Sequence, residues 1–88
     1  EEFNVYQNYP NPFNPQTTIN FDVSTSSEVK INIFDIKGNL ISSYDYGILS
    51  PGIYSYKWDA SGLTSGLYIY SVYTSEGYKK QKQMMLIK

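Results

Sequence analysis

The sequence predicts an all-β protein, an antiparallel β-sandwich of six or seven strands. Apolar and polar residues alternate with a period of two through most of the chain, as in strands that bury one face. Clusters of Gly, Pro, Asn, Asp and Ser interrupt the alternation at intervals of about 8–12 residues, a spacing typical of sandwiches. No stretch has the 3.6-residue periodicity of an amphipathic helix. The predicted architecture is therefore immunoglobulin-like, without the Cys…Trp…Cys pattern of antibody domains.

The chain is expected to divide into a leader, residues 1–8, and a single β domain, residues 9–88. Phe3 and Val5 leave two interpretations of the leader open: a flexible linker from an upstream domain, or the first edge strand. Tyr9–Pro15 follows, with three prolines that lack a backbone N–H and restrict φ. Each residue before a proline is also pushed toward an extended conformation. We expect a stiff, extended segment that sets how the leader joins the domain, with Phe13 docked on the sandwich.

The first two strands of the domain are predicted at residues 17–23 and 29–33. Their alternating apolar residues define the faces turned to the core: Ile19, Phe21, Val23, Val29, Ile31 and Ile33. The polar run Ser24–Ser27 between them indicates a turn. We therefore expect these two strands to be antiparallel neighbours.

The next turn and strand are predicted from Asp35 onward. Aspartate can accept hydrogen bonds from the backbone two residues ahead, and Gly38 can supply a positive φ, so the two residues indicate a turn. A third strand should run from Leu40 to about Tyr46. Gly47–Gly52, which contains Pro51, should then form a loop.

Three further strands complete the expected sandwich, at residues 53–58, 67–74 and 78–87. In the first of them, Tyr54, Tyr56 and Trp58 share one face, which we place inward because Ser55 and Lys57 suit water. In the second, Tyr68, Tyr70 and Val72 share a face. The glycines of the loop 59–66 and of the turn 75–77 separate these strands.

Composition excludes most catalytic chemistry. The chain has no cysteine and no histidine, so it lacks a thiolate, the commonest general base and the commonest transition-metal ligand. Its net charge is −1, without the basic face of a nucleic-acid-binding protein. No apolar run approaches the roughly 20 residues of a membrane span. We expect no enzyme, no cofactor, no nucleic-acid partner and no membrane insertion.

Two binding alternatives remain open at this stage. Oxygen ligands in the turns at Asp35 and Asp59 would suit calcium, although no Asp-x-Asp-x-Asp spacing occurs. Exposed aromatic rings of the ten tyrosines, Tyr73 and Tyr78 above all and then Tyr44 or Tyr46, would suit carbohydrate, but cross-strand packing is the simpler explanation of such rings. The lysines of residues 79–82 would form a recognition patch or a solvated strand that resists aggregation.

Several motifs, taken in order, resemble the type A C-terminal sorting domains of the type IX secretion system. The match begins with Pro10, Asn11, Pro12, Phe13, Asn14 and Pro15, and continues with Asp35 and Gly38, Trp58 and Asp59, Gly66 and Tyr68, and the closing strand Lys82–Lys88. Together the motifs span residues 8–88. The strand pattern around Trp58 is also similar to immunoglobulin-like domains of the flagellar hook cap. Apart from the closing strand, we expect these motif residues to be scaffold rather than contacts.

The resemblance implies a secretion signal. A domain of this kind directs an attached upstream cargo from the periplasm through the outer-membrane type IX translocon to the cell surface or medium, in Bacteroidetes and related phyla. A sortase-like peptidase then commonly removes the domain. We expect the leader to be accessible for such processing, the domain to act as a monomer, and the last strand to be the recognition element, through Lys82, Met84, Leu86 and Lys88. The alternative is a retained, non-catalytic accessory module of a secreted hydrolase, carbohydrate-binding or structural.

Overall fold

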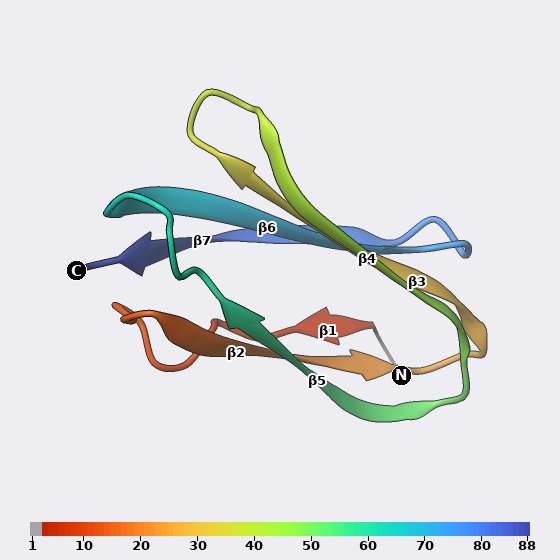
Figure 1. Cartoon of the computed structure of the whole chain (residues 1–88). Helices are drawn as coiled ribbons and strands as arrows, with labels where there is room; N and C mark the ends of the chain where they lie inside the picture. The colour runs from red at the N-terminus through yellow and green to blue at the C-terminus, as the bar shows by residue number, and fades with distance from the viewer. Residues whose placement is uncertain (1–2) are drawn as a thin grey trace.

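The computed structural model describes residues 3–88, which form seven strands (Figure 1). The strands are β1 (Asn4–Val5), β2 (Gln16–Val23), β3 (Ser27–Asp35), β4 (Leu40–Leu49), β5 (Gly52–Asp59), β6 (Gly66–Thr74) and β7 (Lys79–Leu86). Glu1 and Glu2 lie outside the described residues. Among residues 3–88, no helix is long and apolar enough to cross a membrane.

The strands form two antiparallel sheets that pack face to face (Figure 1). One sheet has the order β1-β2-β5 and the other the order β4-β3-β6-β7. The predicted β-sandwich is therefore confirmed. The expectation that β2 and β3 are neighbours is wrong, because β2 pairs with β1 and β5 whereas β3 pairs with β4 and β6. The polar run after Val23 carries the chain from one sheet to the other.

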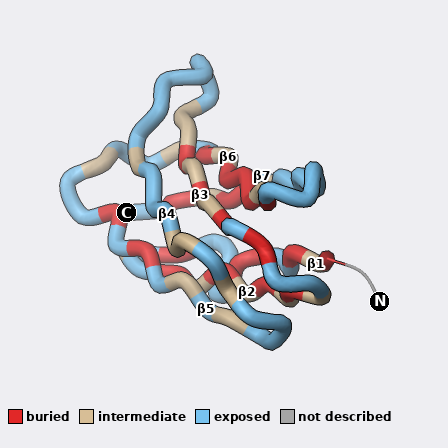
Figure 2. Tube along the Cα trace, turned by 90° about the vertical axis from the view of Figure 1, so that its right-hand side faces the viewer, coloured by how far each residue is buried: buried red, intermediate tan, exposed pale blue. Residues whose placement is uncertain are grey.

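The core lies between the sheets, and Figure 2 shows buried residues along strands of both layers. The inward faces predicted for β2 and β3 are buried, as is the shared face of Tyr68, Tyr70 and Val72 in β6. The inward face predicted for β5 is half-buried except for Trp58, which is fully buried. The largest fully enclosed side chains are Tyr70, Phe21, Ile19, Ile31, Ile33 and Met84. Alternation with a period of two thus located the core correctly, because each strand has one face on it.

Strand β4 is longer than expected, because the residues from Gly47 to Leu49 continue it. The pairing with β3 shifts where Val29 faces Gly47 and Lys30 faces Asp45, so Tyr46 is an extra residue in β4. Gly47 takes φ 73° there, and its N–H donates to the Asp45 carboxylate at 2.9 Å. This is a β-bulge, which bends a strand without ending it. The loop predicted at Gly47–Gly52 is therefore reduced to the two residues between β4 and β5.

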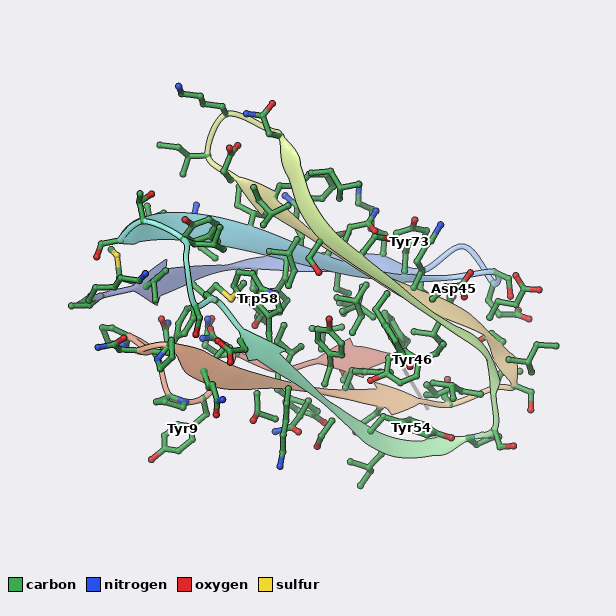
Figure 3. All side chains as sticks on the ribbon, in the orientation of Figure 1. Tyr9, Asp45, Tyr46, Tyr54, Trp58 and Tyr73 are labelled. Carbon is green, nitrogen blue, oxygen red and sulfur yellow. The ribbon has the colours of Figure 1, made fainter. Side chains whose placement is uncertain are left out.

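Four tyrosines close the side of the sandwich between β4 and β5. The ring centroid of Tyr56 lies 5.5 Å from that of Tyr44 and 6.4 Å from that of Tyr46. Tyr46 and Tyr54 in turn contact Phe21, at 5.6 and 5.7 Å. Figure 3 shows Tyr46 and Tyr54 beside the gap between the two sheets. Tyr44 and Tyr46 therefore serve packing, the simpler of the two interpretations of the tyrosine-rich composition.

Residues 3–8 are not the flexible linker of the first interpretation. Val5 pairs with Phe21 of β2, and the side chains of Phe3, Val5 and Asn8 are 2%, 6% and 2% exposed. The ring of Phe3 also packs on that of Tyr78, with centroids 6.0 Å apart. This part of the chain is instead the edge strand of the second interpretation. The first two residues of the expected leader lie outside the described part.

Candidate functional site

The segment of residues 9–15, here called the proline loop, joins the two sheets at one end of the sandwich. The N–H of Tyr9 donates to the carbonyl of Thr18 at 2.9 Å, and the N–H of Thr18 donates back at 3.0 Å. The N–H of Phe13 donates to the carbonyl of Met85, and the N–H of Ile87 donates to the carbonyl of Phe13, both at 3.0 Å. The loop is thus bonded to β2 at one end and to β7 at the other. It bends between these bridges instead of staying extended as predicted.

Phe13 is the side chain that fastens the proline loop to the core. It is only 2% exposed, and its ring centroid lies 6.0 Å from that of Trp58. Trp58 contacts Tyr68 on its other flank, also at 6.0 Å. The predicted docking of Phe13 on the sandwich is confirmed. One aromatic cluster therefore holds together the loop, β5 and β6.

A buried polar cluster lies under the start of the proline loop. The side-chain amide of Asn8 donates to the carbonyl of Pro10 at 3.1 Å and to the hydroxyl oxygen of Thr17 at 2.9 Å, and the Thr17 hydroxyl donates to the same carbonyl at 2.9 Å. The amide of Gln7 donates to the Asn8 side-chain oxygen at 2.7 Å. The cluster was missed in the sequence. In the sequence, only Thr17 indicated the cluster, because it is a polar residue at a position that the alternation of its strand turns inward.

Tyr70 connects this polar cluster to the four-stranded sheet. Its ring is fully buried, and its hydroxyl donates to the carbonyl of Tyr6 at 2.8 Å and accepts from the N–H of Asn8 at 2.9 Å. Burial raises the pKa of Tyr70 to about 12, although the Asn8 N–H acts in the opposite direction. The hydroxyl is therefore neutral and pins the chain before the proline loop to the centre of β6.

The outer edge of β7 is covered over its second half. The backbone carbonyl of Gln83 accepts from the side-chain amide of Gln7 at 2.7 Å, and the N–H of Met85 donates to the side-chain oxygen of Asn11 at 3.0 Å. The next two backbone groups along this edge, the carbonyl of Met85 and the N–H of Ile87, are hydrogen-bonded to the backbone of Phe13. Since alternate residues of an edge strand direct both backbone groups outward, the part left open is the first half, residues 79–82.

The structure divides the four predicted recognition residues. Met84 and Leu86 are buried, at 1% and 0% exposure, and belong to the core. Lys82 is half-buried, and Lys88 is exposed with its backbone N–H donating to the Ser65 hydroxyl at 3.0 Å. Of these four residues, only the two lysines offer a side chain to a partner in the folded domain.

The turn predicted at Asp35 has the expected geometry. One carboxylate oxygen accepts from the N–H groups of Lys37 and Asn39, both at 2.9 Å, and the other from the Asn39 side-chain amide at 3.0 Å. Gly38 takes φ 89°. The bonds from Asn39, followed by that from Lys37, hold the pKa of the Asp35 carboxyl below its usual value.

The carboxylate of Asp59 is likewise occupied by its own turn. It accepts from the N–H and the hydroxyl of Ser61, at 2.8 and 2.5 Å, and from the Gln16 amide at 3.3 Å. The Ser61 bonds lower its pKa. Residues 3–88 contain no group of three or more acidic side chains placed to hold a metal ion. The two aspartates therefore act as turn residues here.

The remaining motif residues gather at the same end of the sandwich as the proline loop. Gly66 faces Leu86 across β6 and β7, and Tyr68 faces Asp35 across β6 and β3. The Tyr68 hydroxyl donates to the carbonyl of Thr64 at 2.7 Å. Motifs far apart in the sequence therefore support one end of the fold. Within the loop, Pro10, Asn11, Pro12 and Asn14 are exposed and Pro15 is half-buried.

Comparison with known proteins identifies this arrangement. A family model described as "Secretion system C-terminal sorting domain" matches residues 7–88. The chain belongs to this family. The sorting domain is therefore a C-terminal signal for type IX secretion, which implies delivery to the cell surface or the medium, and the family is one of sorting signals rather than of catalysts. No curated protein matches the sorting domain.

The fold recurs in a solved structure, dimeric latent PorU from Porphyromonas gingivalis. The superposition has a TM-score of 0.76 at 19% sequence identity and covers 99% of the sorting domain. The domain spans only 10% of the length of that chain. At this identity the likeness shows the sandwich fold alone.

Proposed function

We propose that the sorting domain acts as a folded handle on an upstream cargo in the same chain. The cargo reaches the periplasm first, and the outer-membrane type IX translocon then recognises the folded domain. A sortase-like peptidase separates cargo from domain near their junction. The domain itself works as a monomer, without catalysis or cofactor, and does not insert into the membrane.

The observation that carries this proposal is the backbone pairing of Phe13 between Met85 and Ile87. It places the proline loop, which begins the domain, beside the strand that ends it. We call this joint surface the clasp, and define it as the proline loop with residues 83–88. A partner that binds the clasp contacts the proline loop and residues 83–88 at the same time. It therefore binds only a domain that has folded completely.

Within this handle, the recognition surface combines Lys88 at the clasp with the lysines of the open half of β7, including Lys82. Met84 and Leu86 support it from the core. Lysine side chains provide charge complementarity to an acidic partner. The unpaired backbone groups of residues 79–82 would also accept an added strand.

A reporter fusion tests the recognition surface. The reporter is fused ahead of Glu1 and expressed in a bacterium with an active type IX system. Deleting residues 82–88 would be a poor test, because it removes Met84 and Leu86 from the core. Charge reversal at Lys79, Lys80 and Lys82 together preserves the core, with Lys57→Glu on β5 as the matched control.

We expect the triple variant to accumulate in the periplasm, while the Lys57→Glu control is exported like the wild type. Equal export of the triple variant and the control would contradict the role of the β7 lysines. Export of the reporter without the domain would instead favour a retained accessory module.

A further inference from the structure

A groove of about 400 Å³ lies on the outer face of the four-stranded sheet, away from the clasp. Its walls include three aromatic residues, Phe34 of β3, Tyr73 of β6 and Tyr78 of the turn after β6. Tyr73 stands on the upper side of this sheet in Figure 3. The volume lies at the lower end of the range for small-molecule sites. The groove faces solvent, and none of the three residues is fully buried, although the Tyr78 ring also packs on Phe3.

A hydrogen-bonded row of side chains crosses the groove and fixes its polar groups. The Ser43 hydroxyl donates to the side-chain oxygen of Asn32 at 2.7 Å, which sets the orientation of the Asn32 amide. That amide donates to the hydroxyl oxygen of Tyr73 at 3.3 Å. The Tyr73 hydroxyl keeps its own proton free for a further acceptor. The row therefore presents a positioned donor beside an aromatic face.

Ser71 lines the same groove with a polar group that the protein does not satisfy. The residue is 2% exposed, and its hydroxyl has no hydrogen-bond partner among residues 3–88. A buried hydroxyl without a partner destabilises a fold by about 1–3 kcal/mol. Packing alone does not account for it, because alanine would fit the position without that cost. The hydroxyl oxygen has almost no accessible surface, so a ligand hydroxyl supplies the missing partner only when neighbouring side chains of the groove shift.

The charges around the groove balance. A second depression, of about 230 Å³, lies against the other side of Tyr73 and is lined by Glu28, Lys30 and Asp45. Lys79 lines the groove itself. Two carboxylates and two ammonium groups thus surround Tyr73, so the surface has no preference for an anion or a cation.

We propose that this groove binds a neutral saccharide, with Tyr73 as its central platform. A pyranose ring presents C–H groups on its faces, which pack on an aromatic ring, and hydroxyls at its rim, which suit Asn32, Ser71 and the Tyr73 hydroxyl. A peptide strand fits less well, because β6 already pairs with β3 on one side and with β7 on the other beneath the groove. The groove is separate from the clasp, although Lys79 belongs both to its lining and to the β7 lysines of the proposed recognition surface.

Titration of the ¹⁵N-labelled domain with neutral tetrasaccharides tests the proposal. The probes are a β-1,4-glucan, a β-1,3-glucan and an α-1,6-mannan. We expect saturable chemical-shift changes at the amides of Asn32, Ser71, Tyr73 and Lys79 with at least one probe. No saturable change with any of them at about 10 mM, tenfold above a dissociation constant of about 1 mM, would overturn the proposal.

Three variants separate binding from packing. Tyr73→Phe keeps the ring, and Ser71→Ala removes the unpaired hydroxyl. Each is expected to weaken binding at least about threefold, while the unfolding midpoint of Ser71→Ala stays equal to or above that of the wild type. Tyr9→Ala is the control, since Tyr9 is 78% exposed and outside the groove. Equal loss of binding in Tyr9→Ala, or unchanged binding in both groove variants, would refute the assignment.

Discussion

Truncating Phe13 to alanine should release the clasp from the core. The ring is 2% exposed and contacts Trp58, so its removal leaves a cavity at the end of the sandwich. Phe→Ala changes in cores cost about 3–5 kcal/mol. We expect a loss near the lower limit, about 3 kcal/mol, because the proline loop can partly collapse into the space. For a domain of this size, that loss lowers the melting temperature by roughly 12–24 °C.

Urea unfolding followed by Trp58 fluorescence measures the loss, and hydrogen exchange locates it. The N–H groups of Phe13 and Ile87 bond only within the clasp, so their protection should fall more than that of Ile31, which lies in the central strand β3. Tyr9→Ala is the matched control in the same loop, with an expected change within about 0.5 kcal/mol.

Two results would refute this reasoning. A loss below about 1 kcal/mol for Phe13→Ala would mean that the ring contributes little packing. Unchanged exchange at Phe13 and Ile87 would mean that the backbone pairing does not depend on the ring.

Four further predictions concern Tyr70 and the turn at Asp35 and Gly38. Tyr70→Phe should cost about 1–3 kcal/mol and speed exchange at the Asn8 N–H, because that buried donor loses its partner. Tyr70 also has a raised pKa, so wild-type stability should fall as the pH rises from 10 toward 12, and less so in Tyr70→Phe, in thermal melts. Asp35 has a lowered pKa, so its hydrogen bonds stabilise the fold above the ordinary pKa of the group, and this stabilisation is lost as the pH falls through the folded-state pKa. The melting temperature of Asp35→Ala should therefore decrease less than that of the wild type as the pH is lowered. Gly38→Ala should lower the free energy of unfolding by roughly 1 kcal/mol, because φ is 89° at this position. The loss is measured by urea unfolding, and an unchanged urea midpoint would contradict the strained turn.

Local patterns predicted the strands but not their partners. The alternation in β2 and β3 located Ile19 and Ile31 correctly in the core, because burial on one face is a property of each strand alone. Which sheet a strand joins depends on pairings between residues far apart in the chain. The alternation carries no information about them, so β2 and β3 were wrongly expected to pair.

Local chemistry also explains which parts of the site were predictable. The turns at Asp35 and Gly38 depend on bonds within four residues, and they formed as expected. The bonds of Asn11 to Met85 and of Tyr70 to Asn8 join residues 74 and 62 positions apart. Nothing in the composition near Asn11 or Asn8 indicates such a partner. The clasp therefore became visible only in three dimensions.

The clasp limits how a partner can recognise the last strand. Met84 and Leu86 point into the core, and Gln7, Asn11 and Phe13 cover the outer edge beside them. A free peptide of residues 79–88 has neither the cover nor the core, and must also lose its conformational freedom on binding. We therefore expect that an excess of this peptide does not inhibit export of a reporter fusion, whereas the purified folded domain does, in an assay on permeabilised cells. Inhibition by the peptide at the same concentration as the domain would show that the translocon recognises the strand alone and not the assembled clasp.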